Sequence, residues 1–190
     1  MTVMPSQRLS YDLNEAILKA IGDEFSPEKV TLQFAEALAR KGKNEIEKVA
    51  REVFRNYGKG WMKRSLELGE KHTDATYETL KKAIAKTGVM YFPLVPQRFV
   101  EIAYLSVMSF LTLQVVQNNG QKLAYRLGKC DIYSSLKEKT SAEVVNLLPC
   151  RHGCLTALET LFHDLNISVK IEMEATMPKE GYCQFAASKA

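Results

Sequence analysis

The chain has 190 residues, of which 46% are hydrophobic and 25% are charged, a mix typical of a globular protein. This length fits one domain, and the composition argues against intrinsic disorder and against a coiled-coil rod. The 26 basic and 22 acidic residues give a formal net charge of +4, and the basic residues are interspersed with acidic ones. Because no basic stripe forms, we expect no nucleic-acid partner.

The sequence shows no recognisable export signal or membrane span. Residues 1–10 lack an apolar signal core, and the most apolar stretch, residues 100–116, is interrupted by polar side chains. We therefore expect a cytoplasmic protein in which the four cysteines are reduced thiols. Peripheral attachment to a membrane complex is compatible with this expectation.

The first half of the chain is predicted to be helical, because apolar residues recur at steps of three and four. The predicted helices are residues 11–21, a helix that begins at Ser26 and Pro27, a helix that Asn44 caps and Gly58 ends, residues 61–68, and a helix from Thr73 or Asp74 to Gly88.

After Gly88 the pattern changes, since prolines interrupt helical periodicity and β-branched and aromatic residues become dense. The predicted elements are a strand from Arg98 to Tyr104, a hairpin of residues 109–117 and 121–127 around Asn118, Asn119 and Gly120, and short helices over residues 132–137 and 142–148.

The C-terminal part predicts a helix from Cys150 to His163 and strands over residues 167–173 and 183–187. In the first of these strands Ile167, Val169, Ile171 and Met173 alternate with polar residues. The predicted fold class is α+β, with N-terminal helices packed against an antiparallel sheet and a C-terminal helix and hairpin. We expect one domain over residues 1–190, with a helical part (1–88) and a mixed part (89–190).

The cysteines of this C-terminal part are its most chemically informative residues, because thiols that meet can bind metal, act as nucleophiles or line a ligand pocket. Cys150 follows Pro149 at a predicted helix N-terminus, where the helix dipole stabilises a thiolate. His152 is the nearest candidate base for a catalytic Cys150, and His163 is the alternative. The alternative is that these thiols are buried packing groups.

Aromatic residues before and within the predicted strands offer a second candidate site. Five of them are expected to line a pocket for a flat apolar ligand, although core packing also explains such a density: Tyr91, Phe92, Phe99, Tyr104 and Phe110. The sequence has no phosphate-binding glycine loop and no His-Glu-x-x-His pair, so nucleotide chemistry and common zinc hydrolysis are not indicated.

Residues 148–154 (LPCRHGC) and 181–185 (GYCQF) resemble the C-terminal part of the 4-vinyl-reductase domain family. Its relatives include a tetrapyrrole vinyl-reduction accessory protein, sensor domains of aromatic-responsive regulators and, more distantly, vesicle-tethering subunits. The resemblance implies a non-catalytic protein that binds a hydrophobic small molecule, with a tetrapyrrole the leading candidate. It also implies a helper of photosystem assembly with a photosynthetic membrane complex as partner, a homodimer, or alternatively a component of tetrapyrrole vinyl reduction.

Some members of that family hold zinc, and their ligand positions fall on Cys150, Glu172, Ala175 and Cys183 here. Alanine cannot coordinate a metal, so the resemblance leaves three ligands where a structural zinc site has four. Cys154 lies on the same helix face as Cys150 and is the candidate replacement. Buried thiols without zinc are the favoured interpretation.

A second resemblance involves Cys130. Residues 128–131 (GKCD), Cys150 and residues 181–185 are also similar to the amino-thiazoline carboxylic acid hydrolases, in which a cysteine follows the central hairpin. This resemblance implies cysteine-dependent hydrolysis of a small cyclic thiazoline-type acid. The closing turn departs from the Gly-Asp pattern of that family.

Overall fold

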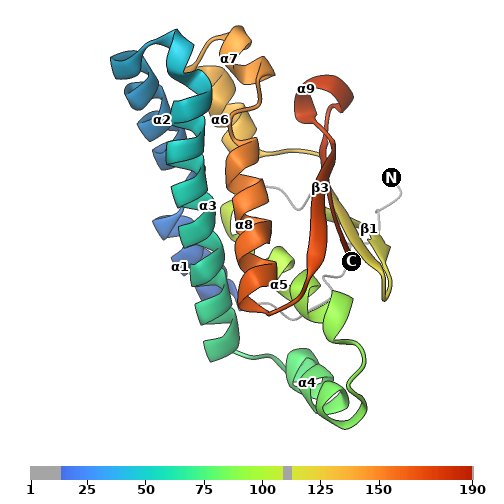
Figure 1. Cartoon of the computed structure of the whole chain (residues 1–190). Helices are drawn as coiled ribbons and strands as arrows, with labels where there is room; N and C mark the ends of the chain where they lie inside the picture. The colour runs from blue at the N-terminus through green and yellow to red at the C-terminus, as the bar shows by residue number, and fades with distance from the viewer. Residues whose placement is uncertain (1–13, 109–112, 190) are drawn as a thin grey trace, which may run out of the picture.

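The computed structural model describes residues 14–108 and 113–189. Its helices are α1 (Glu15–Glu24), α2 (Pro27–Lys41), α3 (Ile46–Lys71), α4 (Ala75–Thr87), α5 (Tyr91–Val107), α6 (Asp131–Lys139), α7 (Ala142–Asn146), α8 (Arg151–Asp164) and α9 (Met177–Glu180), with a 3₁₀ turn at Lys43–Glu45. The strands are β1 (Leu113–Asn118), β2 (Lys122–Leu127), β3 (Val169–Ala175) and β4 (Cys183–Lys189). The long helix α3 runs beside α8, and the sheet lies on the other side of α8 (Figure 1).

The four strands form one antiparallel sheet in the order β1-β2-β4-β3. The sequence-based fold class, α+β, is therefore confirmed. β3 is an edge strand, since it pairs with β4 on one side only. This position matters for the site described below, because an edge strand can be displaced more easily than a central one.

One hydrophobic core joins the helices to the sheet, so the helical and mixed parts of the chain are packed together. Trp61 on α3 packs edge-on against Tyr104 on α5, with ring centroids 4.9 Å apart. Tyr104 in turn contacts Tyr125 on β2, which stacks on Phe185 of β4. This aromatic row therefore links α3 and α5 to the two central strands.

The predicted strand from Arg98 to Tyr104 is wrong, because these residues lie within α5. Every residue from Arg98 to Leu105 is buried, including the charged Arg98 and Glu101, so the helix has no exposed polar face and its burial shows no 3.6-residue periodicity. Pro93 and Pro96 do not exclude this helix. Phe92 is non-helical, so both prolines fall in the first turn after it, where a missing N–H costs little.

The predicted helix end at Gly58 is also wrong, since α3 continues to Lys71 and includes the segment expected to be a separate short helix. A Cβ on Gly58 would lie 2.1 Å from the carbonyl oxygen of Gly153 on α8. Glycine is present here because two helix backbones touch, and its role is packing. Asn44 is not the cap either, because it lies in the 3₁₀ turn and Glu45 precedes the helix.

Most other predicted elements are confirmed, with ends shifted by a few residues. Asp74 caps α4 by accepting a hydrogen bond from the Tyr77 amide, and Gly88 ends that helix in a left-handed conformation. The hairpin forms around residues 118–120, while its predicted beginning at residues 109–112 lies outside the described residues. The helical part extends beyond residue 88, since α5 reaches Val107.

Across residues 14–108 and 113–189, no helix combines the length and the apolar character that a membrane crossing requires.

Candidate functional site

The backbone places Cys150 directly in front of α8. Leu148 adopts a positive φ of 51°, which is uncommon for a non-glycine residue, and turns the chain into Pro149. Cys150 is the N-terminal boundary residue of α8, and its side chain is buried. The close crossing of α3 and α8 at Gly58 and Gly153 fixes the depth at which this cysteine lies.

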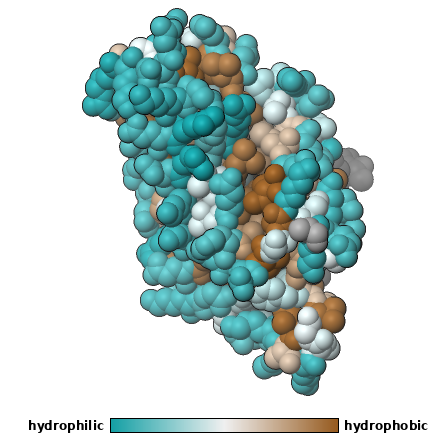
Figure 2. Space-filling model, viewed as in Figure 1, coloured by the Kyte–Doolittle hydropathy of each residue, from teal (hydrophilic) through white to brown (hydrophobic). Residues whose placement is uncertain are grey.

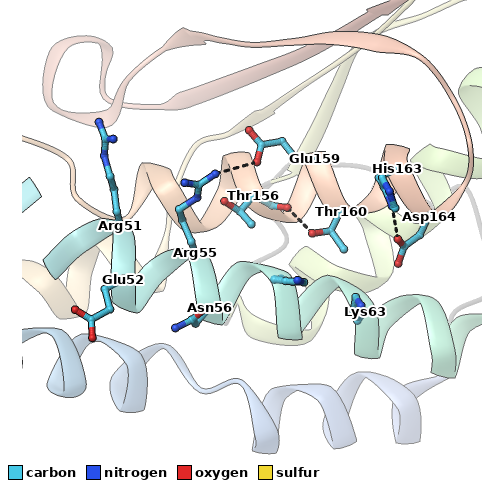
Figure 3. Close-up of a pocket in the computed structure, with 11 residues that line it drawn as sticks. Arg51, Glu52, Arg55, Asn56, Lys63, Thr156, Glu159, Thr160, His163 and Asp164 are labelled. Atoms are coloured by element: carbon cyan, nitrogen blue, oxygen red, sulfur yellow. Dashed lines mark hydrogen bonds and ion pairs between the residues drawn. The ribbon is translucent and has the colours of Figure 1, made fainter. Parts of the chain in front are cut away.

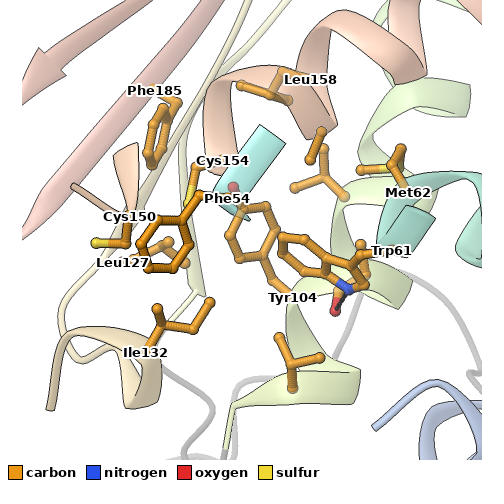
Figure 4. Close-up of a cluster of buried hydrophobic side chains, with 14 of the residues drawn as sticks. Phe54, Trp61, Met62, Tyr104, Leu127, Ile132, Cys150, Cys154, Leu158 and Phe185 are labelled. Atoms are coloured by element: carbon orange, nitrogen blue, oxygen red, sulfur yellow. Dashed lines mark hydrogen bonds between the residues drawn. The ribbon is translucent and has the colours of Figure 1, made fainter. Parts of the chain in front are cut away.

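The four cysteines of the chain converge on one small cavity between α8, α6 and the sheet. Cys130, Cys150, Cys154 and Cys183 all line it, together with Leu127, Tyr133, Leu148, Arg151, Met173 and Phe185. Figure 4 shows Cys150 and Cys154 beside Leu127 and Phe185. The cavity volume is about 10 Å³, which is room for roughly one water molecule.

Burial keeps these cysteines as neutral thiols. It raises the pKa of Cys130 to about 12, and it raises the pKa of Cys150 well above the usual value. The pKa values of Cys154 and Cys183 are also raised, again chiefly by burial. Desolvation therefore outweighs the helix dipole at Cys150, and the thiolate expected from its position is not favoured.

His152, the candidate base, lies on the other side of α8 from the cavity. Its Nε2 is 3.0 Å from Oε1 of Glu47 on α3, and Arg151 also reaches Glu47. Burial lowers the pKa of His152, although the bond to Glu47 opposes this effect. The geometry joins His152 to α3 and leaves Cys150 among thiols, so it does not assemble the nucleophile and base of a cysteine hydrolase.

A buried hydroxyl pair lies behind the cavity. The Tyr125 hydroxyl donates a hydrogen bond to the Tyr104 hydroxyl at 3.0 Å, and Tyr104 lies close enough to Cys154 to affect its pKa. Both tyrosines are fully buried, and burial raises their pKa values well above the usual value. The two buried tyrosine hydroxyls are thus paired with each other.

The aromatic residues predicted to line a ligand pocket do not share one site. Phe99 packs on Tyr77, Tyr104 on Trp61, and Phe92 on Phe162, so these three are core residues in different places. Tyr91 is partly exposed at the start of α5. The fifth, Phe110, lies outside the described residues.

The zinc ligands implied by the 4-vinyl-reductase resemblance do not lie close together either. Glu172 is exposed and pairs with Lys170 at 2.9 Å, and it lies opposite Ala186, on the face of the sheet away from Cys183. Within the described ranges, no three His, Cys, Asp or Glu side chains are placed to hold a metal ion. The proposed set of Cys150, Glu172 and Cys183 is therefore corrected, because strand alternation points Glu172 to solvent.

An apolar groove between α8 and β3 continues from the cavity. Leu155 on α8 and Val169, Ile171 and Met173 on β3 are only half-buried, and Met173 also lines the cavity. Figure 2 shows this strip as a hollowed apolar band between polar surfaces. The sequence correctly predicted that these β3 residues share one face, but it did not predict the groove. Alternating apolar and polar residues do not show that α8 covers this face only partly.

A second, polar hollow of about 790 Å³ lies between α3 and α8 on the surface (Figure 3). A row of basic residues on α3 lines one side, namely Arg51, Arg55, Lys59 and Lys63. The opposite side carries Glu159, which pairs with Arg55 at 4.0 Å, and Asp164, which pairs with His163. The four-residue spacing of the basic row was the sequence signal for this surface.

Comparison with protein-family models, with curated proteins and with solved structures found no significant match for this chain.

The buried thiols predict slow reaction with a soluble disulfide reagent. Folded protein at pH 8 is expected to react at none of its four cysteines within the minutes that unfolded protein needs to react at all four. The reason is that burial both blocks access and raises the thiol pKa values. Ellman titration with and without denaturant measures this, and fast reaction of two or more native thiols would contradict the buried arrangement.

Proposed function

We propose that this protein binds a hydrophobic small molecule in the groove between α8 and β3. The observation that carries the proposal is the convergence of four thiols on an apolar cavity that continues into this groove through Met173. Half-exposed aliphatic side chains on two facing elements form a surface that an apolar ligand would cover. The protein acts in this proposal as a binding or accessory protein.

The size of the cavity requires that the ligand occupy the groove rather than the cavity alone. Ligand sites for drug-sized molecules are typically about 300–1,000 Å³, far more than the 10 Å³ between the thiols. The groove is bounded by the edge strand β3, which is followed in the chain by α9, a short helix that carries no buried residue. Outward displacement of β3 and α9 would enlarge the site at the cost of β3–β4 pairs, and it would leave the pairing of β2 with β1 and β4 intact.

A tetrapyrrole is the first ligand to test, on the basis of the resemblance in residues 148–154 and 181–185. A flat macrocycle suits a slot between a helix and a strand, and the thiols would lie at one of its edges. A role as helper of a photosynthetic membrane complex, or as a component of vinyl reduction, stays a prediction from the same resemblance. The structure does not favour cysteine hydrolysis, because burial raises the pKa of Cys150 and His152 pairs with Glu47.

Titration of the purified protein with protoporphyrin and, separately, with anilinonaphthalene sulfonate tests this proposal. We expect a saturable absorption or fluorescence change at micromolar ligand. Ile171→Asn should weaken binding at least tenfold, because it places an amide in the apolar groove.

The matched control is Lys170→Asn, which introduces the same residue on the solvent face of the same strand. It should bind like the wild type, and thermal melts should show both variants folded. A response to anilinonaphthalene sulfonate alone would rule out a tetrapyrrole as the ligand. Flat titrations with both ligands, or an equal loss of binding affinity in both variants, would refute the site.

A further inference from the structure

The turn between α4 and α5 exposes three consecutive apolar side chains. Val89 is 64% exposed, Met90 is 47% exposed and Tyr91 is 36% exposed. The other large hydrophobic residues exposed among the described ones are single, as Leu32 and Leu147 are, or lie in β1, as Val115 and Val116 do. Figure 1 places α4 at one extremity of the molecule, and Figure 2 shows apolar surface there. We call Val89, Met90 and Tyr91 the apolar tip.

The backbone holds the apolar tip outward at a conformational cost. Gly88 and Met90 both have positive φ, of 66° and 74°, and Met90 is not a glycine. A left-handed backbone conformation is unfavourable for methionine, and the exposed side chain gains little hydrophobic stabilisation that would offset this cost. Such an outlier is a reason to look for function at the same place.

Basic residues accompany the apolar tip. Lys82 and Lys86 lie one turn apart on α4, both are exposed, and neither has an ion-pair partner among the described residues. On the far side of the tip, Lys189 at the end of β4 lies over the Phe92 ring, 5.2 Å from its centroid. The only acidic residue in α4 is Glu78, two turns before Lys86. Glu70 on α3 is the acidic group that acts on Tyr91, and Lys81 pairs with it at 3.6 Å. Lys82 and Lys86 therefore leave the surroundings of the tip with an excess of positive charge.

We propose that the apolar tip inserts into the surface of an anionic phospholipid bilayer, with Lys82 and Lys86 on the lipid headgroups. A projecting apolar turn flanked by unpaired lysines complements a soft apolar layer beneath a negative surface. A protein groove would require a concave partner, and a basic flank adds nothing to self-association because two copies would bring like charges together. The inference is independent of the ligand groove, which lies between α8 and β3.

Co-sedimentation with vesicles tests the proposal. The full chain should pellet with vesicles of phosphatidylcholine and phosphatidylserine, and pellet much less with phosphatidylcholine alone. The double variant Val89→Ser, Met90→Gly should lower the partition coefficient about tenfold or more. Glycine fits the positive φ at position 90, so this variant is expected to fold. Lys82→Gln with Lys86→Gln should lower binding to anionic vesicles by roughly 20- to 30-fold.

The matched control variants change exposed residues away from the apolar tip. Leu147→Ser removes an equally exposed apolar residue, and Lys59→Gln with Lys63→Gln removes two lysines from α3. Both controls should bind like the wild type.

A fluorescence measurement reports insertion directly. Trp61 is the single tryptophan and is fully buried, so Tyr91→Trp adds a reporter whose emission should shift to the blue on anionic vesicles. Absence of binding to both vesicle types, equal binding to neutral and anionic vesicles, or unchanged binding of the tip variants would overturn the proposal. A dimer in light scattering that the Val89 and Met90 double variant dissociates would also overturn it, by assigning the tip to a second copy.

Discussion

Replacing Arg98 by methionine is expected to lower the free energy of unfolding by about 3–5 kcal/mol. Arg98 is 1% exposed, its Nε lies 3.2 Å from Oδ2 of Asp74, and its terminal nitrogens donate to the carbonyl oxygens of Gly69 and His72. The guanidinium also lies over the Tyr77 ring at 4.0 Å. Methionine fills similar volume but removes the guanidinium from two carbonyl oxygens and from a largely buried carboxylate, which keeps only the hydrogen bond from the Tyr77 amide.

Urea denaturation with a spectroscopic readout measures this effect. The control is Arg51→Met, which breaks an exposed ion pair with Glu47 and should cost about 1 kcal/mol or less. Equal losses in the two variants would contradict the view that Arg98 ties α3, α4 and α5 together.

Replacing Gly58 by alanine is the second large effect, with an expected loss of about 3 kcal/mol. The added Cβ would overlap the backbone of Gly153, at 2.1 Å from its oxygen and 2.8 Å from its carbonyl carbon, and backbone atoms of a packed helix yield little. The helices α3 and α8 must then separate, which also moves Cys150 and Cys154 in the thiol cavity. Faster reaction of the variant's thiols with Ellman reagent should accompany the loss.

Gly120→Ala serves as the control for Gly58→Ala. A Cβ on Gly120 meets nothing within 4 Å and the residue has no positive φ, so the change should stay within about 0.5 kcal/mol. If both alanines are tolerated equally, the close crossing of α3 and α8 is not a constraint on the fold.

Local signals in the sequence were sufficient for the fold class and for most elements. Asp74 and Gly88 mark the ends of α4 through capping chemistry, and the hairpin follows from residues 118–120, because these signals depend only on neighbouring residues. The alternation of β3 was also readable, since one face of that strand meets the core and the other meets solvent.

The sequence-based predictions were wrong where tertiary packing determines the secondary structure. α5 looked like a strand because burial on all sides removes helical periodicity, and Gly58 looked like a helix end because sequence cannot show a facing helix. The meeting of Cys150, Cys154 and Cys183 was expected from the predicted helix and hairpin, whereas Cys130 entered only through the second resemblance. The structure places all four at one cavity. For Cys150 the sequence left two interpretations, a thiolate favoured by the helix dipole and a buried packing thiol. The structure favours the second, because burial raises the pKa of this thiol and depends on everything packed around it.

Mass spectrometry of the protein purified under native conditions tests the central claim most directly. We expect a fraction of the folded protein to carry a noncovalent hydrophobic molecule, which Ile171→Asn loses and Lys170→Asn retains. Exclusively ligand-free protein in all three samples, even after incubation with protoporphyrin and with anilinonaphthalene sulfonate, would contradict a binding site between α8 and β3.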